Sequence, residues 1–283
     1  LGEVMRAGWL AGLLFFCLAL FSWPLAASPR VVSLAPFLTD MVVQLDAVDQ
    51  LVGVLDDGQL PAVLDAVPRV GSHQSLSREL ILAQQPDLVL AWTSGNPPEL
   101  LSALESWGIR VERFDPQRLA DIADMTLQLG ELLDARVEAD ILLADYQGQL
   151  TALRRPLTDD APQVFIQLWN DPLYTVSDNQ LIGDALEHCG ARNVFGSLPI
   201  LAPQVGRESV LAADPDMIVV LDDGPTDQHP WLRQWQQFPQ MRAVRNGQLK
   251  VMKGDVLVRP TPQIVQGVRA LCSLVEPQAE MRQ

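Results

Sequence analysis

The chain has 283 residues, of which 48% are hydrophobic, and a formal net charge of −15. A chain of this length and apolar content can build two domains, each with its own core. Because so acidic a chain repels phosphate backbones, we exclude a role in binding DNA or RNA. The acidity otherwise indicates only a soluble surface.

The first 27 residues have the pattern of a secretory signal peptide. A basic start at Arg6 precedes an apolar run at residues 10–21, and small residues at 26–27 fit a cleavage site. The run is too short to span a bilayer. Cys17 lies inside the run and not at the cleavage point, which argues against a lipid anchor. We therefore expect a soluble protein exported to the periplasm.

Strands and helices alternate through residues 28–115, the predicted N-terminal lobe. The predicted strands are 29–34, 51–55, 88–92 and 109–114, and the predicted helices are 39–48 and 98–107. This alternation is typical of a parallel α/β sheet.

Residues 116–160 form a predicted linking helical segment. From Gln117 to Arg155 the chain has no proline, and apolar residues recur at helical spacing. Gly130 is a candidate break. A helix that starts near Arg136 and runs for about 20 residues would be about 30 Å long, enough to join two lobes as a stiff rod. An ordinary pair of surface helices is the alternative that periodicity leaves open.

Residues 161–283 return to the α/β pattern and form the predicted C-terminal lobe. The predicted strands are 164–168, 217–220 and 247–252, and the predicted helices are 179–188, 231–235 and 263–275. The expected fold class is therefore α/β, with two similar lobes whose sheets are mainly parallel, joined by a long interdomain helix.

Two stretches offset by 129 residues share one pattern and support this division. Arg78-Glu79 precedes Pro86-Asp87 and an apolar run, and Arg207-Glu208 precedes Pro215-Asp216 and a second apolar run. Each copy predicts a short helix, a turn and a buried strand. Two similar lobes imply a cleft between them, and such clefts are preferred ligand sites. The glutamate of each copy would then occupy an equivalent place on each lobe.

The sequence lacks the motifs of the common enzyme and metal sites. It contains no G-x-S-x-G elbow and no Gly-rich phosphate loop. Its three histidines, His73, His188 and His229, are scattered without metal-ligand spacing. We expect no catalytic residue, no metal site and no required cofactor. An exported enzyme that uses the cleft is kept as an alternative.

Aromatic residues stand at strand ends in both lobes. Trp92 ends a predicted strand of the first lobe, and Trp169 follows the first strand of the second lobe. Phe37 follows the first strand of the chain, and Asp255 and Arg259 follow the last. In open α/β sheets, ligands bind beyond the carboxyl ends of strands. This set suits a large ligand with apolar and polar edges, and core packing of either tryptophan is the alternative.

Removal of the signal peptide would leave two cysteines, Cys189 and Cys272. An even pair in an exported protein favours a disulfide, with two buried thiols as the alternative. A bridge would close a loop of about 83 residues and stabilise the fold by roughly 4–5 kcal/mol in the chain-entropy model.

Several segments carry a family resemblance that covers essentially the whole mature chain. They are residues 29–36 (PRVVSLAP), 86–92 (PDLVLAW) with 94–96 (SGN), 186–190 (LEHCG) with 193–195 (NVF), 203–205 (PQV) with 207–208 (RE), and 271–272 (LC). In these segments the chain resembles the periplasmic cobalamin-binding proteins of ABC importers, which belong to the helical-backbone family of substrate-binding proteins.

The resemblance implies a monomer that holds a corrinoid, with cobalamin as the transported ligand, between two lobes. It implies a disulfide between Cys189 and Cys272. It also implies that Glu79 and Glu208 dock onto arginines of an ABC permease in the inner membrane. The alternative for both glutamates is stabilisation of helix N-termini.

The resemblance also extends the set of candidate ligand contacts. Trp92 and Trp169 match pocket aromatics of the family, and Asp255 and Arg259 match polar pocket groups. His73 stands where well-known members carry a tryptophan, so the pocket is less aromatic than theirs. The candidate ligand-binding residues are Pro36, Phe37, His73, Trp92, Trp169, Asp255 and Arg259.

Two other hypotheses keep the same fold and assign the protein a different function. A ferric siderophore or haem could replace the corrinoid, but anionic siderophores usually need several arginines, and Arg259 is the single candidate in the predicted cleft. A structural adaptor between membrane proteins is the second alternative.

Overall fold

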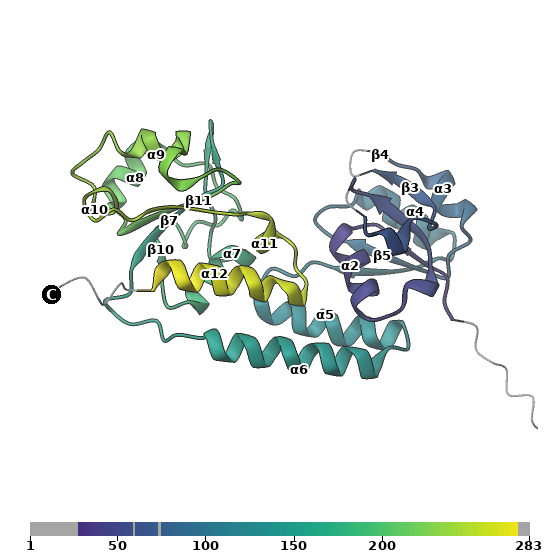
Figure 1. The fold of residues 1–283 in the computed structure, drawn as a ribbon. Coiled ribbons are helices and arrows are strands. Elements are labelled where there is room, and N and C mark those ends of the chain that lie inside the picture. Colours follow the sequence, from purple (N-terminus) through teal and green to yellow (C-terminus); the bar gives the residue numbers. More distant parts are fainter. Residues whose placement is uncertain (1–27, 59, 73–74, 277–283) are drawn as a thin grey trace, which may run out of the picture.

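The structure is a computed structural model that describes residues 28–58, 60–72 and 75–276. It consists of two α/β lobes that lie side by side above a pair of long helices (Figure 1). The expected fold class is therefore confirmed. The predicted signal peptide (1–27) and His73 lie outside the described residues. No helix in the described ranges is long and apolar enough to cross a membrane.

The N-terminal lobe, hereafter the N-lobe, is built on a six-stranded sheet of order β4-β3-β2-β1-β5-β6. All neighbours in it are parallel except β3 and β4. The strands are β1 (Val31–Ser33), β2 (Leu51–Asp56), β3 (Arg69–Ser72), β4 (Ser75–Leu76), β5 (Leu88–Trp92) and β6 (Arg110–Phe114). The helices are α2 (Pro36–Gln44), α3 (Arg78–Ala83) and α4 (Pro98–Ser106), with single 3-10 turns at η1 (Val48–Gln50) and η2 (Ala62–Leu64).

Both faces of this sheet are covered, which explains why its central strands are continuous apolar runs. Leu88 and Leu90 of β5 join the core beneath α2, whereas Val89 packs with Leu100 and Leu101 of α4 on the other face. Helix α2 begins at Pro36 and ends at Gln44, so the predicted span of 39–48 was wrong at both ends. Proline suits the first helical position because its fixed φ is helical and its missing N–H is not needed there.

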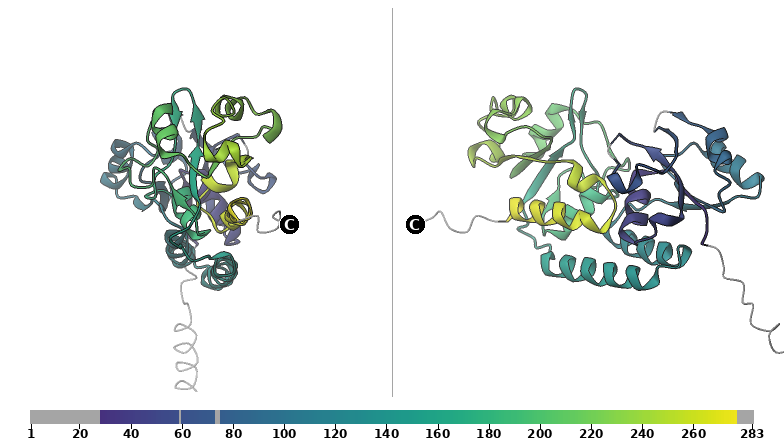
Figure 2. Two further views of the ribbon diagram at one scale, coloured as in Figure 1. Left: turned by 90° about the vertical axis from the view of Figure 1, so that its left-hand side faces the viewer. Right: turned by 45° about the vertical axis from the view of Figure 1, so that its right-hand side comes forward.

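The linking segment is two antiparallel helices, α5 (Leu119–Leu132) and α6 (Arg136–Leu153), which lie beneath both lobes (Figures 1 and 2). The break falls at 133–135, where Asp134 has a φ of 53°, and not at Gly130 as predicted. Gly130 instead lets the helices approach, because an added Cβ would collide with the Ala139 side chain.

Both ends of this helix pair are tied to a lobe. Near the turn, the Gln50 amide donates to the Leu133 carbonyl at 2.7 Å. At the other end, the Asp184 carboxylate of the C-terminal lobe accepts from the Leu119 N–H at 2.7 Å and pairs with Arg118 at 2.6 Å. The chain thus passes between the lobes at residues 115–118, returns along α5 and crosses again along α6.

The C-terminal lobe, hereafter the C-lobe, has a four-stranded parallel sheet of order β10-β7-β11-β12 and a separate hairpin. The sheet strands are β7 (Gln163–Gln167), β10 (Arg192–Asn193), β11 (Met217–Leu221) and β12 (Leu249–Met252), and the hairpin strands are β8 (Trp169–Asn170) and β9 (Leu173–Tyr174). The helices are α7 (Leu181–His188), α8 (Arg207–Ala213), α9 (Pro230–Trp235), α10 (Arg242–Arg245), α11 (Asp255–Val258) and α12 (Val265–Val275), with 3-10 turns η3 (Thr226–Gln228) and η4 (Pro262–Ile264).

The disulfide between Cys189 and Cys272 is present, as predicted. Cys189 follows α7 directly, and Cys272 lies on α12, so the bridge joins two helices of the C-lobe. Both cysteines are buried, and the closed loop spans 83 residues.

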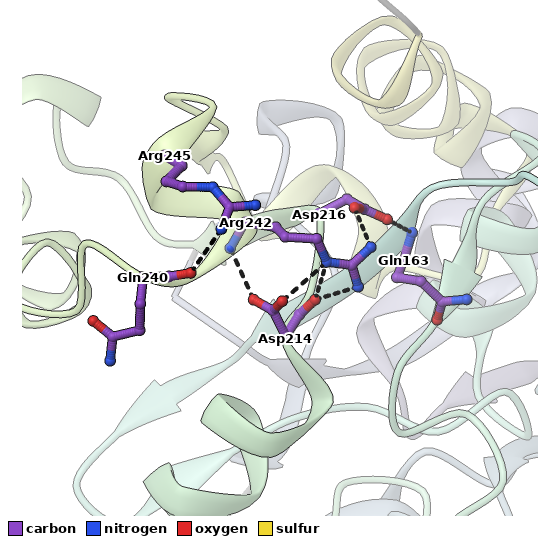
Figure 3. Close-up of polar contacts among 6 residues, drawn as sticks. All are labelled: Gln163, Asp214, Asp216, Gln240, Arg242 and Arg245. Atoms are coloured by element: carbon purple, nitrogen blue, oxygen red, sulfur yellow. Dashed lines mark hydrogen bonds and ion pairs between the residues drawn. The ribbon is translucent and has the colours of Figure 1, made fainter.

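The repeated Pro-Asp turn makes the same contact in both lobes. In the N-lobe the Asp87 carboxylate accepts from the backbone N–H of Arg30 at 2.9 Å. In the C-lobe the Asp216 carboxylate accepts from the backbone N–H of Gln163 at 2.8 Å (Figure 3). Each aspartate also donates its own N–H to the carbonyl of that same partner. The repeat therefore pins each buried strand beside the first strand of its lobe.

Candidate ligand-binding cleft

A cavity of about 510 Å³ lies between the lobes. The N-lobe and the segment at 115–117 supply one wall, and the C-lobe supplies the other. The residues that line it are Pro36, Phe37, Asp57, Trp92, Ser94, Asp115, Pro116, Gln117, Gln180, Leu181, Leu201, Ala202, Leu257, Val258, Arg259 and Pro260. Pro36 and Trp92 mark the carboxyl ends of the central strands β1 and β5, where ligands of open α/β sheets bind.

The N-lobe wall is aromatic, and its tryptophan is held firmly. The Trp92 ring meets the edge of the Phe37 ring, with centroids 6.0 Å apart and planes at 87°. Its indole N–H donates to the Asp115 carboxylate at 2.9 Å. Gly95 lies against the ring, because a Cβ added there would collide with it. The buried Asn96 side chain accepts from the Trp92 backbone N–H at 2.7 Å, which fixes the loop after β5.

Charged groups in the cleft join the two lobes. Arg259 follows α11 of the C-lobe, and its guanidinium contacts Asp40 of α2 at 2.9 Å and Asp57 at 3.3 Å, both in the N-lobe. Desolvation disfavours the charged guanidinium, but the hydrogen bonds and charges of the two aspartates outweigh it. The pKa of Arg259 is therefore raised above its ordinary value. Asp57 and Arg259 both line the cavity, so this ion pair spans the cleft.

The C-lobe wall is aliphatic and continues onto an exposed rim. Leu201 and Val258 line the cavity, yet 39% and 55% of their surfaces are exposed. Ile200, 64% exposed, adjoins Leu201. Exposed apolar surface gathered at one place is a mark of a binding site.

Trp169 does not line the cavity. It begins the β8–β9 hairpin, and 56% of its surface is exposed. Its ring lies 5.8 Å from that of Trp231, and its indole N–H donates to the Asp171 carbonyl at 3.1 Å. Tyr174, paired with Trp169 in the hairpin, also bridges to Gln204, next to the lining loop at 201–202. The first strand of the C-lobe thus continues into a hairpin where the N-lobe starts a helix.

The other predicted ligand contacts are placed as follows. Pro36, Phe37, Trp92 and Arg259 line the cavity. Asp255 begins α11 and borders a separate depression of about 280 Å³ on the other side of Arg259. Leu257 and Val258 are the residues of that short helix that line the cleft.

The sequence prediction missed several lining residues, and Asp115 is the clearest case. It directly follows β6, so the strand-end rule that selected Trp92 would also have selected Asp115. Both of its carboxylate oxygens are engaged, one by the Trp92 indole and the other by the Ser94 hydroxyl. Leu201 and Ala202 lie in an irregular loop, for which the sequence offers no periodic signal.

The repeated glutamates lie at matching helix starts. Glu79 is in the first turn of α3 and Glu208 in the first turn of α8, and both are exposed. Hydrogen bonding to its own backbone N–H, together with the Ser77 hydroxyl, lowers the pKa of Glu79. Helices α3 and α8 lie on the outer parts of the two lobes, on the side away from α5 and α6 (Figures 1 and 2).

The described histidines have structural partners. The His188 ring contacts the Leu150 carbonyl at 2.8 Å, and the buried His229 contacts Asp222 at 2.9 Å. Among the described residues, no group of three or more His, Cys, Asp or Glu side chains is arranged to hold a metal ion.

Comparison with known proteins identifies the family. The periplasmic binding protein family matches residues 31–256. A vitamin B12-binding protein of Vibrio cholerae serotype O1 is 30% identical over 269 residues, which cover 93% of this chain and 96% of the relative. The solved periplasmic vitamin B12 binding protein of Vibrio cholerae has a TM-score of 0.72 at 29% identity and covers 88% of this chain and 96% of its own. A solved periplasmic heme binding protein from Pseudomonas aeruginosa has a TM-score of 0.71 at 28% identity and covers 89% and 94%.

These matches agree with the two-lobed fold. The family consists of non-enzymatic proteins that bind small molecules and deliver them to ABC permeases. The chain belongs to the periplasmic binding protein family and is a solute-binding protein of an ABC importer.

Proposed function

We propose that this protein captures a corrinoid, with cobalamin as its ligand, in the periplasm and delivers it to an ABC permease of the inner membrane. The observation that carries the proposal is the cleft itself, with an aromatic and acidic wall on the N-lobe and an aliphatic wall on the C-lobe. The relatives named as vitamin B12-binding proteins support the same ligand.

The two walls suit the two kinds of surface that a corrinoid offers. Its macrocycle is a broad apolar plate, which Trp92, Phe37 and the aliphatic wall would contact. Its rim carries side-chain amides, whose N–H groups donate hydrogen bonds to carboxylates such as Asp57 and Asp115. Trp169, which is exposed outside the cavity lining, would contact a part of the ligand that extends beyond the cavity.

The charges of the cleft favour a ligand without carboxylates. Haem carries two propionates, and many ferric siderophores are anionic, so both call for unpaired cations. Arg259 is the cation among the lining residues, and it is already paired with Asp40 and Asp57. Haem is kept as the second candidate because a heme-binding protein is among the structures at 28% identity.

Calorimetric titration of the purified protein with cyanocobalamin, hemin and ferrichrome tests the ligand. We expect saturable binding of cyanocobalamin with a Kd of micromolar or tighter. Trp92→Ala should weaken it by at least about 1 kcal/mol, roughly fivefold or more, through lost ring contacts. Trp107→Ala is the matched control, since Trp107 is exposed and stacks beneath Arg78 outside the cleft.

Absence of saturable cyanocobalamin binding would overturn the ligand assignment, and equal losses in the Trp92 and Trp107 variants would overturn the proposed contact between Trp92 and the ligand. Saturable binding of hemin alone would support the second candidate. Asp255 stays a predicted ligand contact, to be tested by the same titration of Asp255→Asn.

For delivery, we propose that Glu79 and Glu208 contact basic residues of the permease, one on each half. Their equivalent positions in the repeat, their exposure and their shared side of the molecule support this role. Paired charges at such a surface set orientation and association rate more than affinity.

A further inference from the structure

Asp115 occupies a special place in the cleft. It follows β6 and opens the segment at 115–118 through which the chain first passes between the lobes. Asp121, in the first turn of α5, accepts from the Gln117 N–H at 2.8 Å and so fixes the end of this segment. The Asp115 carboxylate therefore projects from an anchored stretch of backbone into the cavity lining.

Both hydrogen bonds that Asp115 accepts come from neutral donors. One oxygen accepts from the Trp92 indole N–H at 2.9 Å, and the other accepts from the Ser94 hydroxyl. Across the described ranges Asp115 forms no ion pair, whereas Asp57, the other carboxylate in the lining, is paired with Arg259. Its charge is thus balanced by dipoles and remains available to a ligand in the cleft.

These contacts give Asp115 two separable effects. Its acceptor oxygen fixes the direction of the indole N–H, and with it the plane of the Trp92 ring between Phe37 and Gly95. Its negative charge, in a partly desolvated cleft, attracts amide N–H donors and repels carboxylates.

We propose that Asp115 is a positioning and specificity-determining residue of the cleft. Its oxygen orients Trp92, and its charge selects ligands whose rim groups are amides over ligands whose rim groups are carboxylates. The inference rests on the proposed function, since it names the chemical class that the same cleft accepts.

The matched ligands are cyanocobalamin and its three monocarboxylic acids, in each of which one propionamide has become a carboxylate. The wild-type protein should bind at least one of the acids about fivefold or more weaker than cyanocobalamin, as like charges in the cleft require. Asp115→Asn keeps an acceptor for Trp92 and removes the charge. In this variant the acid should therefore bind less than about twofold more weakly than cyanocobalamin. Asp159→Asn is the control, because Asp159 is exposed and lies outside the cavity lining.

Positioning is tested by Asp115→Ala, which removes the acceptor as well as the charge. It should weaken cyanocobalamin binding by roughly fivefold or more, whereas Asp115→Asn should stay within about threefold of the wild type. In a Trp92→Phe background, which has no indole N–H, Asp115→Ala should weaken cyanocobalamin binding less than it does in the wild-type background. Thermal melts of each variant establish that it is folded.

The outcomes distinguish a failure of the Asp115 role from a failure of cobalamin binding itself. If cyanocobalamin does not bind the wild type, the proposed function fails and the role of Asp115 falls with it. If cyanocobalamin binds but all three acids give the same ratios in wild type and Asp115→Asn, charge selection is overturned alone. If the alanine and asparagine variants bind cyanocobalamin equally well, the positioning role is overturned.

Discussion

The two lobes share a scaffold contact and differ in the walls that they present to the cleft. Asp87 and Asp216 pin the repeated strand to the first strand of each lobe in the same way. The last residue of the repeated strand is Trp92 in the N-lobe and Leu221 in the C-lobe, and Trp92 lines the cleft whereas Leu221 is buried in the core. The repeat thus specifies how each sheet is held together. The strand end supplies an aromatic residue to the N-lobe wall, whereas helices and an irregular loop supply the aliphatic residues of the C-lobe wall.

A second difference lies in how each turn is reinforced. In the N-lobe the Arg30 guanidinium donates to the Gln84 and Gln85 carbonyls. In the C-lobe, Arg242 contacts the Asp214 carbonyl and also pairs with the Asp214 and Asp216 carboxylates (Figure 3). Gln85 and Asp214 stand at matching repeat positions and both have positive φ, 49° and 43°. The C-lobe turn therefore has ion pairs that the N-lobe turn replaces with carbonyl contacts.

The largest expected difference between the lobes comes from the disulfide, which lies within the C-lobe. Changing both Cys189 and Cys272 to alanine should lower the free energy of unfolding of the C-lobe by about 2–5 kcal/mol. Hydrogen exchange of core amides, read by mass spectrometry, should show faster exchange in β7 and β11 and little change in β1 and β5. Equal acceleration in both lobes would contradict independent C-lobe stabilisation.

The repeated aspartates provide the next comparison. Asp216→Ala should lower the free energy of unfolding by about 2–3 kcal/mol, because it removes a charged acceptor of a backbone N–H together with an ion pair to Arg242. Asp87→Ala should lower the free energy of unfolding by about 1–2 kcal/mol, since it removes the backbone contact alone. Denaturant unfolding measures both, and a larger loss for Asp87→Ala would contradict the assigned roles.

Much of the scaffold was predictable from the sequence because it depends on local patterns. The apolar run at 88–92 matches β5, and the helix predicted from near Arg136 matches α6. The start of α2 was missed because the helix was predicted from residue 39, whereas Pro36 occupies its first position.

The cleft was predictable only in part. Trp92 followed from the strand-end rule, and so would Asp115, since Trp92 ends β5 and Asp115 directly follows β6. Leu201 and Ala202 could not be found in this way, because irregular loops carry no period. The hairpin that holds Trp169 outside the cavity lining depends on tertiary contacts, including the bridge from Tyr174 to Gln204.

The ion pair across the cleft offers a smaller test of how the lobes are held. Asp40→Asn should weaken the contact of Arg259 and allow the lobes to separate more easily. The cost in stability should be at most about 1 kcal/mol, because the guanidinium is 41% exposed and screened by salt. Small-angle scattering should report a modestly larger radius of gyration, and 1 M salt should enlarge the wild type in the same way. An unchanged radius in both would contradict the bridging role.

Glu79 and Glu208, which we propose contact the permease, should behave alike in the two lobes, so the expected difference between them is the smallest. Glu79→Gln and Glu208→Gln should each slow association with the permease several-fold, and the double variant should slow it further. Because the pKa of Glu79 is lowered, this carboxylate should stay ionised to a lower pH than an ordinary glutamate, so its contribution should be lost only on stronger acidification. Surface plasmon resonance with the permease in nanodiscs measures these rates, and an effect confined to one lobe would contradict paired docking.

Hydrogen exchange of the protein with and without cyanocobalamin tests the central claim most directly. A ligand gripped by two unlike walls should protect amides on both, around 37 and 92–96 in the N-lobe and around 201–202 and 257–259 in the C-lobe. Helices α3 and α8 should exchange as before. Protection limited to one lobe, or absent from the Trp92 segment, would contradict a ligand site shared between the lobes.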